Sequence, residues 1–305
     1  MNTQSNAMPD SPLGPQESTP AAVPPATQTR PLYWSIRREL WENRSIYIAP
    51  LVAAGVVLIA FLIATIGRAV ATVDSAQKAA VLAERNDFAA GVLMATAFIV
   101  GVFYCLDALH GERRDRSVLF WKSLPVSDFT TVLSKASIPL VVLPLIIFAV
   151  IVATQLIMLL LSSAALLMSG LSAAPSTPWL QTTLILLYHL LTVHALWYAP
   201  IYAWLLLVSG WARRAVFLWA VLPLLAIGVV EKIVFNTSYF ATMMLHRLTG
   251  PERSHLAAPG SVPAHPMMTF DPGAFLSAPG LWIGLAVAAA FLAAAVRLRR
   301  YREAI

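Results

Sequence analysis

Six apolar stretches constrain the fold of this chain more than any other feature. Each can supply the roughly 20 residues that an α-helix needs to cross a hydrocarbon layer of about 30 Å. They lie at residues 48–67, 88–109, 138–168, 179–209, 215–235 and 281–296, of which the last is the shortest. Lipid offers no partners to backbone polar groups, so apolar stretches of this length are expected to be helical. The sequence therefore predicts an all-α, polytopic membrane protein with six transmembrane helices.

The composition excludes the common classes of soluble protein. Hydrophobic residues make up 58% of the 305 residues and charged residues only 12%, against about 25% charged in soluble domains. The single cysteine, Cys105, excludes a disulfide framework and a cysteine-based metal cluster. The net charge of +6 does not indicate a nucleic-acid partner, because the cations flank apolar stretches instead of clustering on one soluble face.

The distribution of lysine and arginine predicts the orientation. With six spans, both termini share a side of the membrane. Of the 21 Lys and Arg residues, 15 fall on that side and six on the other. Cytoplasmic loops carry the excess of positive charge, so we expect both termini in the cytoplasm.

Two segments precede the first span. Residues 1–30 are rich in Pro, Ser, Thr, Gln and Ala, which favours a disordered cytoplasmic tail. Residues 32–45 instead show helical periodicity, with one side formed by Leu32, Tyr33, Ile36, Leu40 and Trp41. This pattern is typical of an amphipathic helix that lies in the membrane interface. The alternative is a helix that only prolongs the first span into the cytoplasm.

The cytoplasmic loop at residues 110–135 has the most distinctive sequence. Basic residues are followed by the apolar block 118–121, and Pro125 then indicates a turn. Ser127 is placed to cap the next helix, with Asp128 in its first turn. Exposure of large apolar side chains to water is unfavourable, so the block requires a surface to bury against.

This loop resembles the first cytoplasmic loop of ABC-2 type permeases, the membrane subunits of a class of ATP-driven transporters. The likeness rests on Glu112 with the two arginines that follow, on residues 119–121 and 123–127, and on Lys135. It departs at Arg116 and Ser117, where Gly-Thr is common in the family. The wider plan covers about residues 31–302, with an extended outer segment at 236–280. Within that segment, the helical periodicity of Tyr239, Phe240, Met243, Met244 and Leu248 predicts one short helix.

The resemblance implies that the loop is a coupling helix that docks on a separate nucleotide-binding subunit. The coupling interface would be formed by Arg113, Arg114, Arg116, Leu119, Phe120, Trp121, Leu124, Pro125 and Ser127. ATP and Mg would then be bound by the partner, and this chain would hold no cofactor. The resemblance also implies a second permease copy and a location in the bacterial inner membrane. In the alternative interpretation, the aromatic block lies on lipid headgroups and the arginines only fix the topology.

Four polar residues within the spans are candidates for a translocation path: Gln155, His189, His194 and Glu231. Ionisable groups within a membrane are costly and therefore functional candidates by default. The two histidines lie five residues apart, or about 140° around an α-helix, so we expect no shared metal site. Alternatively, both histidines are hydrogen-bonded interior groups and Glu231 reaches the outer interface.

The remaining motifs limit the function. No GxxxxGK[ST] phosphate loop occurs, so any ATP hydrolysis must come from a partner. HExxH and GxSxG are also missing from the sequence, which argues against a membrane-embedded enzyme. We therefore expect a permease subunit of an ATP-binding-cassette exporter. An ion-coupled carrier or a non-transporting membrane scaffold is the alternative.

Overall fold

The computed structural model describes residues 30–68, 75–115, 126–168, 179–249 and 272–301. The regular elements found there are all helical, as predicted. From Pro31 onward the chain forms one compact unit. The helices, in chain order, are α1 (Pro31–Glu42), α2 (Ser45–Arg68), α3 (Ser75–Ala108), α4 (His110–Arg114), α6 (Asp128–Ser137), η1 (Ile138–Val142), α7 (Leu143–Met168), α8 (Trp179–His189), η2 (Leu190–Trp197), α9 (Ala199–Trp211), α10 (Val216–Phe235), α11 (Tyr239–Thr249), α12 (Pro272–Ser277) and α13 (Pro279–Tyr301).

Within the described residues, five helical segments are long and apolar enough to cross a membrane. They are Ser45–Thr65, Phe88–Arg114, Asp128–Ala164, Val216–Phe235 and Pro279–Tyr301. A sixth span results if the bent pair Leu186–Trp197 and Ala199–Trp211 counts as one. These helices are those of a multi-pass membrane protein. The stretch at 281–296, the shortest in the sequence, belongs to a helix of 23 residues.

Prolines explain the irregular helices. Pro200 lacks an N–H and its ring clashes with the carbonyl four residues earlier, and the chain bends by 44° between η2 and α9. Pro139 is the second residue of the π-helical η1, and Pro144 follows two residues after its end. There the Leu143 N–H donates to the carbonyl of Ile138, five residues back. The two π-helical segments contact each other.

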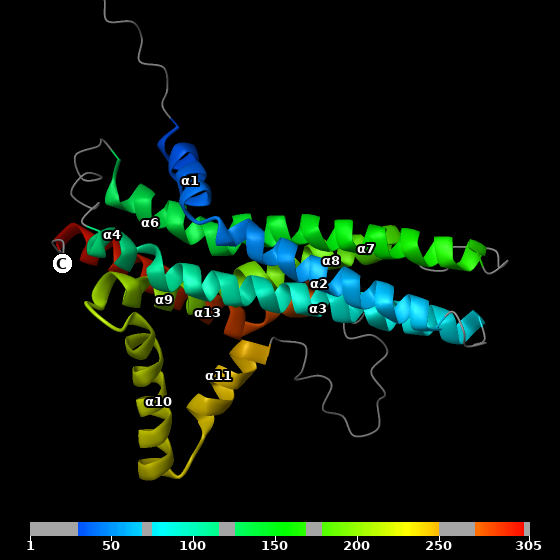
Figure 1. Ribbon diagram of the computed structural model, residues 1–305. Helices are drawn as coiled ribbons and strands as arrows, with labels where there is room; N and C mark the ends of the chain where they lie inside the picture. Colours follow the sequence, from blue (N-terminus) through cyan, green and yellow to red (C-terminus); the bar gives the residue numbers. More distant parts are fainter. Residues whose placement is uncertain (1–29, 69–74, 116–125, 169–178, 250–271, 302–305) are drawn as a thin grey trace, which may run out of the picture. The chain divides into compact units, whose positions relative to one another are not determined.

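The core lies where α2, α3, α7, α9 and α13 pack side by side (Figure 1). Tyr202 of α9 is 1% exposed and packs against Gly101 of α3, where an added Cβ atom would lie 2.9 Å from the tyrosine ring. Apolar side chains outside this core are widely exposed, and only 11% of the α10 segment is buried. Such surfaces are favourable in lipid and unfavourable in water.

Helix α1 begins within one residue of the start predicted for the helix at 32–45 and ends at Glu42, three residues before the predicted end. It also divides the predicted apolar face. Ile36 and Leu40 pack against the core, and Glu39 between them is buried. Tyr33 and Trp41 are instead 56% and 70% exposed. Helix α1 packs against α6, so it is more than an extension of the first span.

Within the described residues, the segment at 236–280 contains two short helices before α13 begins. The helix predicted from the periodicity of Tyr239, Phe240, Met243, Met244 and Leu248 is confirmed as α11, and α12 follows later in the segment. Residues 250–271, and residues 1–29 of the disordered tail predicted at 1–30, lie outside the described residues.

Candidate functional site

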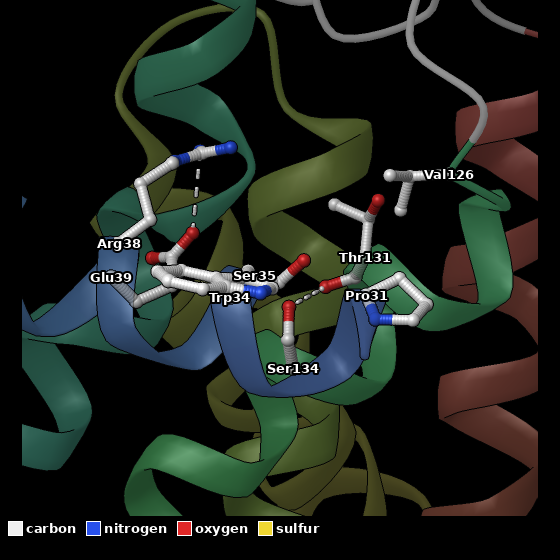
Figure 2. Close-up of a pocket in the computed structure, with 8 residues that line it drawn as sticks. All are labelled: Pro31, Trp34, Ser35, Arg38, Glu39, Val126, Thr131 and Ser134. Atoms are coloured by element: carbon white, nitrogen blue, oxygen red, sulfur yellow. Dashed lines mark hydrogen bonds and ion pairs between the residues drawn. The ribbon is translucent and has the colours of Figure 1, made fainter. Parts of the chain in front are cut away.

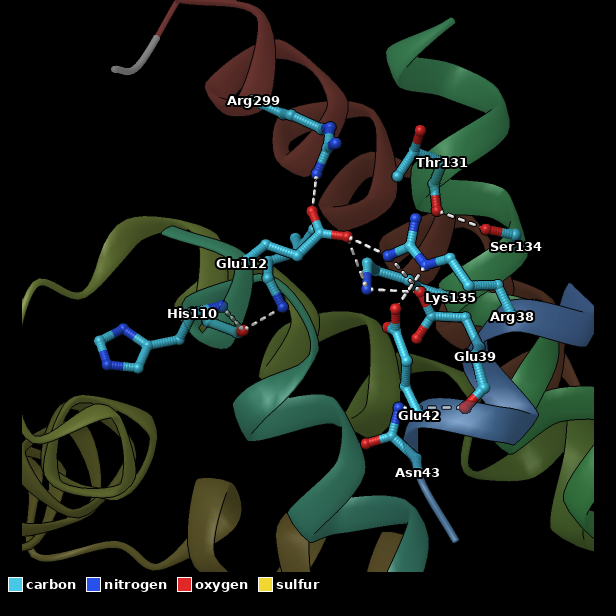
Figure 3. A network of polar contacts seen from close by, with 12 residues as sticks. Arg38, Glu39, Glu42, Asn43, His110, Glu112, Thr131, Ser134, Lys135 and Arg299 are labelled. Atoms are coloured by element: carbon cyan, nitrogen blue, oxygen red, sulfur yellow. Dashed lines mark hydrogen bonds and ion pairs between the residues drawn. The ribbon is translucent and has the colours of Figure 1, made fainter. Parts of the chain in front are cut away.

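Six charged side chains meet at the end of the bundle where α1, α4, α6 and α13 come together (Figure 3). We call this group the ionic cluster; it consists of Arg38, Glu39, Glu112, Asp128, Lys135 and Arg299. It brings the first described helix and the last turn of the last helix to the same end of the molecule.

Glu39 and Lys135 join α1 to α6. Each is 2% exposed, and the Lys135 Nζ atom lies 2.8 Å from the Glu39 Oε1 atom. The second oxygen of Glu39 accepts a hydrogen bond from the Tyr104 hydroxyl of α3 at 2.9 Å. Both carboxylate oxygens of this buried acid are therefore bound, as the interior requires of a charged group.

Glu112 is the centre of the ionic cluster. Its Oε1 atom lies 2.9 Å from Arg38 Nη2 and 3.2 Å from Lys135 Nζ. Its Oε2 atom accepts a hydrogen bond from Arg299 Nη1. Figure 3 shows the carboxylate between Arg299 on one side and Arg38 and Lys135 on the other. One acid from α4 thus binds cations from three other helices.

Arg299 connects the two described helices on either side of residues 116–125. Its Nη1 atom binds Glu112 in α4, and its Nε atom lies 3.1 Å from Asp128 Oδ1 at the start of α6. Arg299 and Glu112 are 9% and 8% exposed, so their ion pair is only weakly screened by salt. Helices α4 and α6 are therefore held together by the C-terminal turn of α13.

The charge of Arg38 on α1 is balanced within the protein. Burial by itself would lower the pKa of Arg38, but the carboxylates of Glu39 and Glu42 and the hydrogen bond to Glu112 outweigh burial and raise this pKa. Arg38 Nε also lies 3.0 Å from the half-exposed Glu42. Arg38 therefore stays charged and links α1 to α4.

The predicted cap at the start of α6 is confirmed. Ser127 has extended backbone angles, and its hydroxyl accepts a hydrogen bond from the Thr130 N–H at 3.1 Å. Asp128 lies in the first turn, where the helix dipole favours an anion. The serine thus fixes the point at which the chain enters α6.

The arginines predicted for the coupling interface occupy different environments. Arg113 is buried, and its Nη1 atom donates to the Gly210 carbonyl at 2.8 Å. Arg114 is exposed and pairs with Asp115. Arg113 thus binds carbonyl groups at the C-terminal end of α9. Of the predicted coupling arginines that the structure describes, Arg114 is the one exposed to a partner. Six other predicted members of this interface lie outside the described residues: Arg116, Leu119, Phe120, Trp121, Leu124 and Pro125.

Helix α9 and the start of α4 are joined by side-chain hydrogen bonds from each of them to the backbone of the other. While Arg113 binds the end of α9, the Ser209 hydroxyl of α9 accepts hydrogen bonds from the N–H groups of Leu109 and His110, both at 2.9 Å. These N–H groups lie at the break between α3 and α4. A movement of α4 would therefore pull on α9.

A cleft of about 160 Å³ opens between α1 and the start of α6 (Figure 2). It is lined by Pro31, Trp34, Ser35, Arg38, Glu39, Val126, Thr131 and Ser134. Arg38 and Glu39 belong to the ionic cluster, and Val126 directly follows residues 116–125 in the sequence. The cleft is therefore continuous with the ionic cluster.

The four translocation-path candidates come from four elements, α7, α8, η2 and α10. Gln155 is 7% exposed in α7, and His194 is 4% exposed, with its Nε2 atom 3.3 Å from the Tyr202 hydroxyl. His189 ends α8 and His194 lies in η2. The angle of 140° expected between the histidines assumes an α-helix. It does not hold here, because the i→i+5 pattern of a π-helix turns residues five apart toward one side.

Glu231 has a defined structural task. Its Oε1 atom accepts hydrogen bonds from the Thr237 hydroxyl and the Tyr239 N–H, and its Oε2 atom accepts one from the Phe240 N–H, all between 2.7 and 2.8 Å. The carboxylate of α10 therefore caps the N-terminus of α11. Within the described residues, no cluster of three His, Cys, Asp or Glu side chains suited to a metal ion is found.

Glu112 and Lys135 were identified from the sequence as parts of the permease-like motif at 110–135. Their ion pairs with Glu39 and Arg299 were not predicted. One feature of the sequence did indicate that Glu39 is buried. It follows Ile36 by three residues and directly precedes Leu40, so it lies on the face of the helix that packs inward.

Searches against protein-family models, curated proteins and solved structures find no match to this chain.

Proposed function

We propose that this chain is the membrane-spanning permease subunit of an ATP-binding-cassette exporter. ATP would be hydrolysed by a separate nucleotide-binding subunit, and a second permease copy would complete the transporter. The proposal starts from the resemblance of the 110–135 loop to ABC-2 type permeases. Both termini would lie in the cytoplasm of a bacterial cell, at the inner membrane, in agreement with the excess of cations at that end.

The single observation that favours this function is the double attachment of Arg299. The residue binds Glu112 and Asp128, on either side of residues 116–125. A loop that receives force from a partner needs anchored ends, since a loop on free ends would move without displacing the helices. Here the ends are tied to α13 directly, and through Glu112 also to α1 and α6.

The remaining contacts supply a route for the movement. Arg113 and Ser209 connect α4 to α9, and α9 packs against α3 and α13. Displacement of the loop would thus reach helices of the core through buried hydrogen bonds. The predicted path residues Gln155 and His194 lie in helices α7 and η2, which contact each other.

The proposal is tested on the full chain in a mild detergent. We expect an ABC-type ATPase to co-purify, and Phe120→Ala combined with Trp121→Ala to abolish the association, because large buried side chains dominate interface energies. Tyr239→Ala, at an exposed aromatic residue in α11, serves as the matched control and should leave the association with the ATPase intact. Unchanged association in the double variant would overturn the coupling assignment.

A second measurement separates this function from an ion-coupled carrier. In membrane vesicles, transport by the proposed complex should stop without ATP and continue when ionophores collapse the ion gradients. The opposite dependence would identify a carrier. No transport under either condition would favour a membrane scaffold.

A further inference from the structure

Helix α1 exposes an aromatic face that takes no part in the ionic cluster. Tyr33, Trp34 and Trp41 are 56%, 57% and 70% exposed. With Arg37, which is also exposed, they fall within a sector of about 100° at 3.6 residues per turn. We call these four residues the aromatic stripe.

Arg37 lies between the two tryptophans of the stripe. Its Cζ atom is 5.4 Å from the ring centroid of Trp34 and 5.2 Å from that of Trp41, within the range of cation–π attraction. Tyr33 packs edge-on against Trp34 at 5.5 Å. The guanidinium is thus held among aromatic rings on the outside of the protein.

The opposite side of α1 fixes the rotation of the helix. Ile36 and Leu40 pack into the core and Glu39 is bound to Lys135. This rotation leaves Tyr33, Arg37 and Trp41 exposed, and Trp34 is exposed beside the cleft that it helps to line. Only two residues separate α1 from α2, the first candidate span. The stripe therefore lies near the level at which the chain enters the membrane.

The chemistry of the stripe fits one kind of partner. Tryptophan and tyrosine are enriched at the headgroup level of membranes, and arginine binds phosphate oxygens through its planar pair of donors. The nearby acids do not cancel its charge, because Glu39 is bound by Lys135 and Glu42 by Arg38. Arg44, exposed just after α1, adds a second cation.

We propose that the aromatic stripe is a binding surface for anionic phospholipid headgroups. The two tryptophans would lie among the headgroups while Arg37 pairs with the phosphate groups. This inference is independent of the transport function and requires only that the chain spans a membrane.

The test uses the purified full chain in a nonionic detergent, with phosphatidylglycerol or phosphatidylcholine added in increasing amounts. We expect phosphatidylglycerol to raise the unfolding temperature more than phosphatidylcholine does. Arg37→Gln should raise the phosphatidylglycerol concentration for the half-maximal effect about fivefold, the factor for one cation at an anionic surface. Arg300→Gln removes an exposed cation from α13, at the same end of the bundle. This control variant should change the half-maximal phosphatidylglycerol concentration less than twofold.

Two further variants test the parts of the stripe. Arg37→Lys keeps the charge but loses the planar donors, so we expect an intermediate value. Trp34→Ala with Trp41→Ala should weaken the response to phosphatidylglycerol as well. Equal stabilisation by the two lipids, or equal effects of Arg37→Gln and Arg300→Gln, would overturn the proposal, because general electrostatics would then explain the binding.

Discussion

At the scale of single residues, Glu112 makes the largest number of ion pairs in the ionic cluster. The side chain is 8% exposed and is shared by Arg38, Lys135 and Arg299. A buried ion pair contributes little net stability by itself, because desolvation offsets the attraction. Removal of one partner is costly, because it leaves the others buried and uncompensated.

Glu112→Gln should therefore destabilise the protein by about 3 kcal/mol. The change keeps the shape of the side chain but leaves the three cations without their shared anion. Unfolding of the full chain in detergent, followed by temperature or denaturant, measures the effect. Glu42→Gln is the matched control, since Glu42 is half-exposed and pairs with Arg38 alone among these cations; it should cost at most about 1 kcal/mol. Equal losses in the two variants would contradict a central role for Glu112.

At the scale of secondary-structure elements, the connection between α10 and α11 depends on Glu231. The carboxylate accepts two N–H groups in the first turn of α11, and Asn236, with φ of 50°, takes the left-handed conformation that ends α10. Asparagine tolerates that region better than most residues. A helix exposed on most sides thus relies on its ends for its position.

Glu231→Ala should release the start of α11. The N–H groups of Tyr239 and Phe240 would lose their acceptor, so their hydrogen exchange should become several-fold faster, while exchange in the core helices stays unchanged. Hydrogen exchange followed by mass spectrometry resolves the two regions. Lys232→Ala, at the exposed neighbouring position, should not alter exchange in α11. Unaltered exchange in Glu231→Ala would show that the cap does not hold the helix.

At the scale of the whole molecule, the ionic cluster makes the first and last helices dependent on each other. Glu39 of α1 and Arg299 of α13 are far apart in the sequence, and Lys135 and Glu112 connect them. In this arrangement, removal of a charge on one helix should change the free-energy cost of removing its partner on another helix.

A double-mutant cycle measures this dependence. Lys135→Met alone should cost about 3 kcal/mol, because the carboxylates of Glu39 and Glu112 lose a buried partner. Adding Glu39→Gln should recover about 1 kcal/mol, because it removes one of these unpaired charges. The exposed pair Arg114 and Asp115 serves as the control, with no measurable coupling expected. Additive effects for Glu39 and Lys135 would contradict an energetic link between α1 and α6.

The comparison of sequence and structure separates local from distant effects. The cap at Ser127 and the helix at 239–249 could be predicted because a cap depends on neighbours three residues away and a periodic pattern on one turn. The π-helical stretch at 190–197 could not be predicted. Its hydrogen bonds shift by one residue under the constraint of Pro200 and of packing against η1, which no local pattern records.

What the sequence by itself determined is the apolar, all-helical character of the chain and its membrane class. Length and hydrophobicity of a span are local properties, and the bilayer imposes the rest. Only the tertiary structure decided that Glu39 pairs with Lys135, that Arg113 binds the end of α9 and that Arg299 joins α4 to α6. Charge partners are chosen by which helix ends meet in space, and that choice depends on the packing of the entire bundle.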